Sequence, residues 1–170
     1  IPILIIQYLH MSNGSLGLTQ SLMSVGGFVG CTLAGIFSKK MQLHHGLYPL
    51  FGISILCFAF SIATLPVFTS SLIYYGITIL AFCMMTLASY FNIWFFSYIQ
   101  IKAPASQIGK VISLLTVLVC LTQPVGRIIY GLLYEILSNH PWIVLFFAGI
   151  LSVGINILAF FIFVSHRHQP

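Results

Sequence analysis

The stretch WIVLFFAGILSVGINILAFFIFV, residues 142–164, contains no charged side chain. As an α-helix rising about 1.5 Å per residue, it is long enough to cross the roughly 30 Å hydrocarbon core of a bilayer. The 170-residue chain has the same character throughout, with 59% hydrophobic and 4% charged residues, whereas soluble domains carry about 25% charged residues. Its apolar runs are longer than barrel strands and do not alternate. The sequence therefore predicts an all-α integral membrane protein.

Working outward from this stretch, apolar runs separated by polar or Gly/Pro clusters predict a single membrane domain over 1–170. An apolar stub at 1–9 is too short to span a bilayer and is expected to be the end of a truncated span. Five full spans are expected at 15–37, 46–65, 71–98, 109–137 and 142–164, followed by a tail at 165–170.

The basic residues test the number of spans. If five spans alternate in direction, every loop or tail cation falls on one side of the membrane. These cations are Lys39, Lys40, Lys102, Lys110 and Arg167. By the positive-inside rule that side is cytoplasmic. The chain is therefore expected to be a multi-pass protein of the cell membrane with a cytoplasmic C-terminus.

Several classes of function are excluded by composition. Glu135 is the only acid, so paired-carboxylate catalysis and carboxylate-rich metal sites are excluded within this chain. The four cysteines are far apart and the six histidines fall in loops or tails, so neither an enzyme, a metal site nor a bound cofactor is expected. A net charge of +5 provides too few cations for a nucleic-acid interface.

Small residues predict where helices approach closely. Gly26, Gly30 and Ala34 recur at every fourth position of the first full span, which is typical of helix packing in membranes. Gly126 and Gly131 of the fourth span are further predicted packing positions. The second and fifth spans contain few polar residues and are expected to face lipid.

Polar side chains form a stripe on the fourth span, at alternating spacings of three and four residues: Ser113, Thr116, Cys120, Gln123, Arg127, Tyr130 and Tyr134. Such a stripe is costly against acyl chains and is expected to face the bundle interior or a wet cavity. Arg127 lies in the outer third of the membrane, where a cavity role and snorkelling to the headgroups are both open. Pro124 predicts a kink beside it, and interrupted helices are typical of transporter sites.

The third span carries a second stripe: Thr78, Met85, Ser89, Asn92 and Phe96. An amide within a span requires a partner or water. The two stripes together supply the predicted substrate-cavity residues: Ser89, Asn92, Thr116, Gln123, Arg127 and Tyr130.

Several motifs resemble those of the major facilitator superfamily. They are Gln100-Ile-Lys-Ala-Pro104, then Gly109-Lys110-Val111-Ile112-Ser113, then Pro124-Val125-Gly126 with Gly131. This series is similar to the region joining the tenth and eleventh helices, and most of all to the macrolide-efflux type of drug antiporter. The run from Gly26 to Lys40 resembles the eighth helix and its following basic loop.

The resemblance implies that the chain is the C-terminal six-helix half of a twelve-helix carrier, starting late in helix seven. Such a carrier exports drug-like or amphipathic molecules by alternating access, driven by an ion gradient, expected to be of protons. Its partners would be the bilayer, the missing N-terminal half and a small-molecule substrate. The alternative is an inactive truncated remnant, or an accessory membrane subunit without transport activity of its own.

Overall fold

The computed structural model describes residues 2–37, 47–65, 67, 69–104, 106–137 and 141–165, and these residues contain helices but no strand. The expected all-α architecture is confirmed. The elements are the π-helix η1 (Ile3–Tyr8) and the α-helices α1 (Asn13–Phe37), α2 (Leu47–Ala63), α3 (Ser70–Lys102), α4 (Ile108–Ile136) and α5 (Pro141–Ser165). Lys39, Lys40 and the tail 166–170 lie outside the described residues.

Within the described residues, four helices are long and apolar enough to cross a membrane, namely α1, α3, α4 and the Trp142–Phe161 part of α5. Helix α2 is also apolar but has only 17 residues, or about 26 Å at helical rise, slightly less than the hydrocarbon core. Of the five full spans expected from the sequence, four are helices of spanning length, and the second, α2, is shorter. The chain is a membrane-embedded helical protein.

The end of α3 illustrates how the sequence fixes a helix boundary. Pro104 disfavours helical geometry at the residue before it, and Ala103 is extended, with φ −75° and ψ 140°. Helix α3 consequently stops at Lys102, four residues beyond the end expected for the third span. Lys102 and Lys110 thus lie at the helix ends on either side of this short connection.

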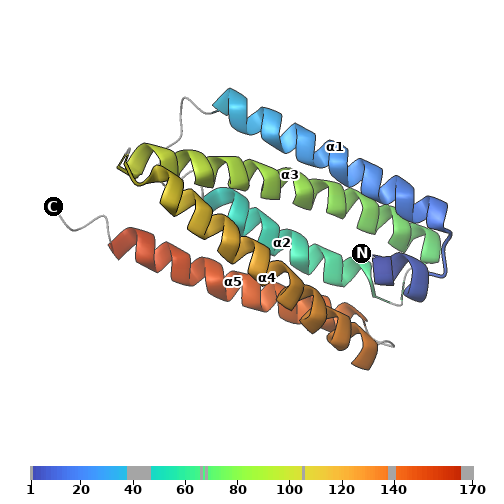
Figure 1. Ribbon diagram of the computed structural model, residues 1–170. Coiled ribbons are helices and arrows are strands. Elements are labelled where there is room, and N and C mark those ends of the chain that lie inside the picture. The colour runs from blue at the N-terminus through green and yellow to red at the C-terminus, as the bar shows by residue number, and fades with distance from the viewer. Residues whose placement is uncertain are drawn as a thin grey trace.

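The helices lie side by side as long rods (Figure 1), with α3 in contact with both α1 and α2, and α2 also in contact with α5. The closest association is between α1 and α3. Helix α4 contacts α3 and α5 only at a few points. The bundle therefore consists of a packed row, α1, α3, α2 and α5, to which α4 is loosely attached.

The hydrophobic core joins η1, α2 and α3 near the N-terminal end of α3. It consists of Leu4, Ile5, Leu9, Phe60, Ile73, Tyr74, Ile77 and Ala81. The π-helical turn is closed by the Leu9 N–H, which donates to the Leu4 carbonyl oxygen at 2.9 Å. Tyr74 also donates its hydroxyl to the Ser15 carbonyl oxygen at 3.1 Å, which ties α3 to the start of α1.

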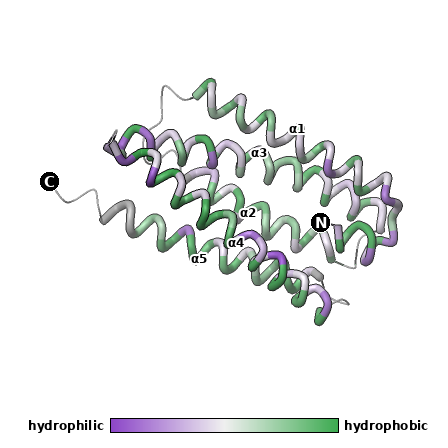
Figure 2. Tube along the Cα trace, in the orientation of Figure 1, coloured by the Kyte–Doolittle hydropathy of each residue, from purple (hydrophilic) through white to green (hydrophobic). Residues whose placement is uncertain are grey.

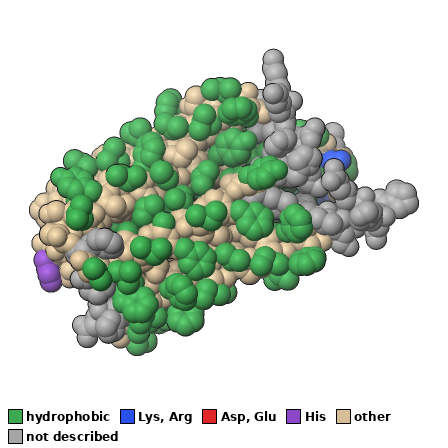
Figure 3. All heavy atoms as spheres, turned by 180° about the vertical axis from the view of Figure 1, so that it is seen from behind, with side chains coloured by type: hydrophobic (Ala, Val, Ile, Leu, Met, Phe, Trp, Pro, Cys, Tyr) green, Lys and Arg blue, Asp and Glu red, His purple; other side chains and the backbone are tan. Residues whose placement is uncertain are grey.

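Most of the outer surface is apolar. Figure 2 shows hydrophobic positions along every helix, with hydrophilic ones near the helix ends and in the second half of α4. On the face seen in Figure 3, hydrophobic side chains are spread over the described surface from one end to the other, and many large ones are exposed. Exposed apolar side chains of this extent are stable in lipid and would aggregate in water.

Candidate functional site

Helix α4 carries the longest polar stripe and is the least embedded helix of the bundle. None of its residues is buried, and Thr116, Gln123 and Arg127 are exposed. The opposite face of the helix is apolar and is also exposed: Leu114, Leu118, Leu121, Val125 and Leu132. Helix α4 therefore has one face suited to lipid and one suited to water or polar ligands.

A hollow of about 200 Å³ lies on the polar face of α4, lined by Cys120, Gln123, Pro124 and Arg127. The helix continues through Pro124 without a break. Because proline has no backbone N–H, the Cys120 carbonyl four residues earlier loses its normal helix hydrogen bond. The hollow thus places a guanidinium and an amide next to a helix turn that lacks one backbone hydrogen bond.

The size of the hollow limits what it can hold. Pockets for drug-sized ligands typically measure about 300–1,000 Å³, so a hollow of about 200 Å³ accommodates one polar group of a ligand. The rest of such a ligand would require surfaces from other helices.

Arg127 has no acidic partner in this chain. Glu135 is the only acid of the sequence and lies eight residues further along α4, about 12 Å away along the helix axis. Residues eight apart are also not neighbours on a helix surface. The positive charge of Arg127 must therefore be compensated by a group from outside the chain or by water.

Tyr134 shows which way the polar stripe is turned. Its ring packs against the core cluster formed by η1, α2 and α3, and Arg127 and Tyr130 precede it on the same helix face. The stripe is therefore directed along the bundle side of α4.

Thr116 lies nearer the start of the helix. Its hydroxyl donates to the Ile112 carbonyl oxygen at 2.9 Å, so it can offer a ligand only an acceptor.

The stripe expected on the third span divides into two parts. Thr78 is buried, and its Oγ1 lies 3.1 Å from Thr19 Oγ1 of α1. Ser89 also faces α1, since a Cβ added at Gly27 would lie 3.3 Å from Ser89 Oγ. Asn92 is exposed. The α4 hollow is lined by α4 alone, so the structure does not bring Ser89 or Asn92 into it.

The predicted packing positions of the first span lie against α3. A Cβ added at Gly26 would lie 2.6 Å from the Phe82 carbonyl oxygen, and one at Gly30 would collide with the carbonyl oxygen of Thr86. Ala34 continues the row and is completely buried. We call this row the glycine seam. It brings the backbones of α1 and α3 into direct contact.

The two glycines of α4 behave differently. Among the described residues, no atom lies within 4 Å of a Cβ added at Gly126 or Gly131. The packing expected at these two positions is absent here because α4 stands away from its neighbours.

A polar cluster joins α2 and α5, and the sequence pattern does not predict it. The Asn156 side-chain amide donates to the Leu50 carbonyl oxygen at 2.9 Å and to Ser54 Oγ at 2.6 Å. Ser54 Oγ also lies 2.7 Å from Ser152 Oγ, and Ser61 donates to the Trp142 carbonyl oxygen at 3.0 Å. The spans expected to face lipid therefore bind each other through polar groups. The only sequence signal is the four-residue spacing of the two α5 members.

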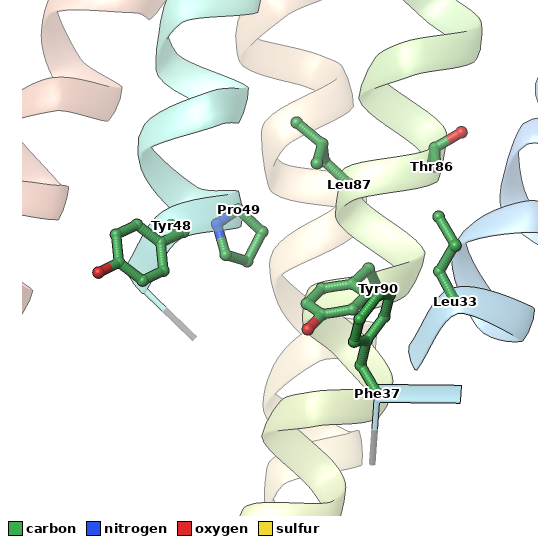
Figure 4. A pocket seen from close by; sticks show the side chains of 7 residues that line it. All are labelled: Leu33, Phe37, Tyr48, Pro49, Thr86, Leu87 and Tyr90. Atoms are coloured by element: carbon green, nitrogen blue, oxygen red, sulfur yellow. The ribbon is translucent and has the colours of Figure 1, made fainter. Parts of the chain in front are cut away.

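A larger hollow of about 390 Å³ lies between three helices (Figure 4). Its lining combines α1, α2 and α3: Leu33, Phe37, Tyr48, Pro49, Thr86, Leu87 and Tyr90. The surface is mostly apolar, and the Thr86 hydroxyl is already used in donating to the Phe82 carbonyl oxygen at 2.9 Å. Because its lining comes from three separate spans, the sequence alone does not indicate this hollow.

The described residues contain no group of three or more His, Cys, Asp or Glu side chains that could hold a metal ion. In comparisons with known proteins, no family model, curated protein or solved structure matches the chain. The fold and the hydropathy of its helices define a membrane-embedded helical protein.

Proposed function

We propose that this chain is the C-terminal half of a secondary active transporter of the major facilitator type, exporting drug-like or amphipathic molecules by alternating access. The observation that supports this proposal is the hollow on α4, where Gln123 and Arg127 flank Pro124 on an exposed helix face. Pro124 removes one backbone hydrogen bond from this continuous helix, and polar side chains within a membrane-spanning helix are typical of substrate pathways. The motif resemblance assigns α4 to a cavity-lining helix.

Helices α1 and α3 also have polar or open positions that support a cavity. Gln20 and Ser24 are exposed on the same face of α1. A Cβ added at Gly35 of that face would have no atom of the described residues within 4 Å. Asn92 is exposed on α3. The resemblance places these two helices, with α4, around the central cavity, whereas α2 and α5 are peripheral.

The proposed partner is a second set of helices that closes the cavity opposite α4. The proposal also includes a location in the cell membrane, with Lys102 and Lys110 on the cytoplasmic side. If protons drive transport, the coupling carboxylate belongs to the partner helices, because Glu135 lies at the last turn of α4 and no other acid is present.

The proposal is tested by dye efflux from cells. The chain is produced alone and in frame with six further spans, and efflux is measured for neutral, cationic and anionic amphipathic dyes. We expect only the longer protein to extrude dye, and we expect Gln123→Leu to reduce efflux at least severalfold. Val125→Leu, on the opposite face of the same helix, is the matched control and should leave efflux unchanged.

The alternative function predicts a different result. An inactive remnant or an accessory subunit would give no efflux in either form, with no effect of Gln123→Leu. That outcome would refute the transporter proposal.

A further inference from the structure

Arg127 is a cation on a membrane-spanning helix without an anion in its own chain. Its position is nine residues before the end of α4, about 14 Å along the axis at helical rise. A guanidinium at this depth is stable only with a counter-charge or water. Because the sequence contains one acid and that acid is out of reach, any counter-charge comes from another molecule.

The lining of the hollow indicates the chemistry of that molecule. Arg127 and Gln123 both provide N–H donors, and a planar guanidinium binds two oxygens of one oxyanion. The Cys120 carbonyl, released by Pro124, accepts a hydrogen bond from a donor next to the oxyanion. The volume of about 200 Å³ suits one such group. These features together match a carboxylate with a neighbouring N–H or O–H.

We infer that the α4 hollow binds the carboxylate of a small amphipathic organic anion, with Arg127 as its charge partner and Gln123 as its hydrogen-bond donor. This inference rests on the proposed function, since it names the substrate class of the same cavity. The stripe is directed along the bundle by the packing of Tyr134 on the core, which favours a ligand within the cavity over a lipid headgroup beyond the helix end.

Cys120 makes the charge of the hollow measurable. It is an exposed free cysteine in the same lining as Arg127. We replace Cys31, Cys57 and Cys83 by serine and reconstitute the chain in phosphatidylcholine nanodiscs. The modification rate of Cys120 is then measured with an anionic and a cationic methanethiosulfonate reagent. The rate with the anionic reagent is divided by the rate with the cationic reagent. This ratio is then divided by the same ratio measured for the reaction with 2-mercaptoethanol, which removes the intrinsic difference in reactivity between the two reagents.

We expect the anionic reagent to be favoured roughly threefold or more, because the Arg127 guanidinium lines the same hollow as the Cys120 thiol and attracts an anion that enters it. Arg127→Gln should abolish this preference, and Arg127→Lys should retain most of it. Lys110→Gln is the matched control. It removes the same charge from the same helix, about 15 Å from Cys120 at helical rise, and Lys110 does not line the hollow.

The ligand class is tested by protection. Dansylglycine, which carries a carboxylate, should slow modification of Cys120 in the parent protein and not in Arg127→Gln. Dansylglycinamide has the same dye and no charge, and it should protect at least tenfold more weakly. Adding phosphatidylglycerol to the nanodiscs should leave the rate ratio unchanged, whereas a headgroup bound to Arg127 would lower it.

The possible outcomes separate the two proposals. If neither reagent modifies Cys120, the hollow is dry, and both the wet cavity and the anion site are wrong. If both reagents react without a charge preference, or if the preference survives in Arg127→Gln, the anion site is wrong and the cavity stands. Equal protection by the two dansyl compounds would likewise overturn the assignment of a carboxylate.

Discussion

Replacing the glycines of the glycine seam by alanine should separate α1 from α3. At Gly26 the added Cβ would lie 2.6 Å from a backbone oxygen of α3, whereas ordinary contact begins at 3.4 Å. Because a backbone atom cannot rotate away, the helices must part by about 0.8 Å. Overpacking of this kind costs about 1–3 kcal/mol, and the steric conflict at Gly30 is more severe.

Gly35 provides the matched control, since it lies on the same helix and an added Cβ there would have no described atom within 4 Å. Alanine at this position gains up to about 1 kcal/mol from helix propensity, a gain that Gly26→Ala shares. We therefore expect the free energy of unfolding to differ by about 2 kcal/mol between the two variants, and by more for Gly30→Ala.

The measurement is a titration of dodecylmaltoside micelles with sodium dodecyl sulfate, followed by energy transfer between dyes on α1 and α3. The transition midpoint and slope give the free energy of unfolding of each variant. If Gly26→Ala, Gly30→Ala and Gly35→Ala unfold at the same denaturant fraction, the close contact between these helices does not exist.

Three further predictions concern other parts of the bundle. Asn156→Leu removes two hydrogen bonds between α2 and α5 and should lower the free energy of unfolding by about 1 kcal/mol; in a double-mutant cycle with Ser54→Ala, a coupling energy of zero would argue against the contact. Gly126→Ala should not destabilise the protein, since the added methyl meets no described atom, and a loss above about 1 kcal/mol in the same titration would show that α4 is packed more tightly. In cells, Lys110→Cys should react with an impermeant maleimide only after the membrane is opened, and Glu135→Cys without opening; the reverse pattern would contradict the orientation predicted from the charges.

The glycine seam shows how much of the packing the sequence reveals. Gly26, Gly30 and Ala34 are spaced so that only one helix face can contain them, and close backbone approach is the physical reason for such spacing. The spacing does not name the partner, because any neighbouring helix could fill the groove. The structure supplies α3 as that partner.

The cluster at Asn156 shows why the rest could not be read from the sequence. Helix α5 is apolar nearly all round, and this composition also suits a helix that faces lipid. A single amide reverses that interpretation, since it cannot remain without a partner in hydrocarbon. Its partners Leu50 and Ser54 are about a hundred residues away in the sequence, and local periodicity carries no information at that separation. The same limit applies to Thr78, whose contact with Thr19 depends on the tertiary arrangement.

The loose attachment of α4 has an energetic consequence. Because α4 buries no residue, tilting it would break few packing contacts. Separating α1 from α3 would break the close backbone contact along the glycine seam. We therefore expect α4 to tilt more readily than the packed row of α1, α3, α2 and α5. Within this chain, α4 is the helix that can change its tilt most easily, and α1 and α3, joined by the glycine seam, are the pair that resists separation.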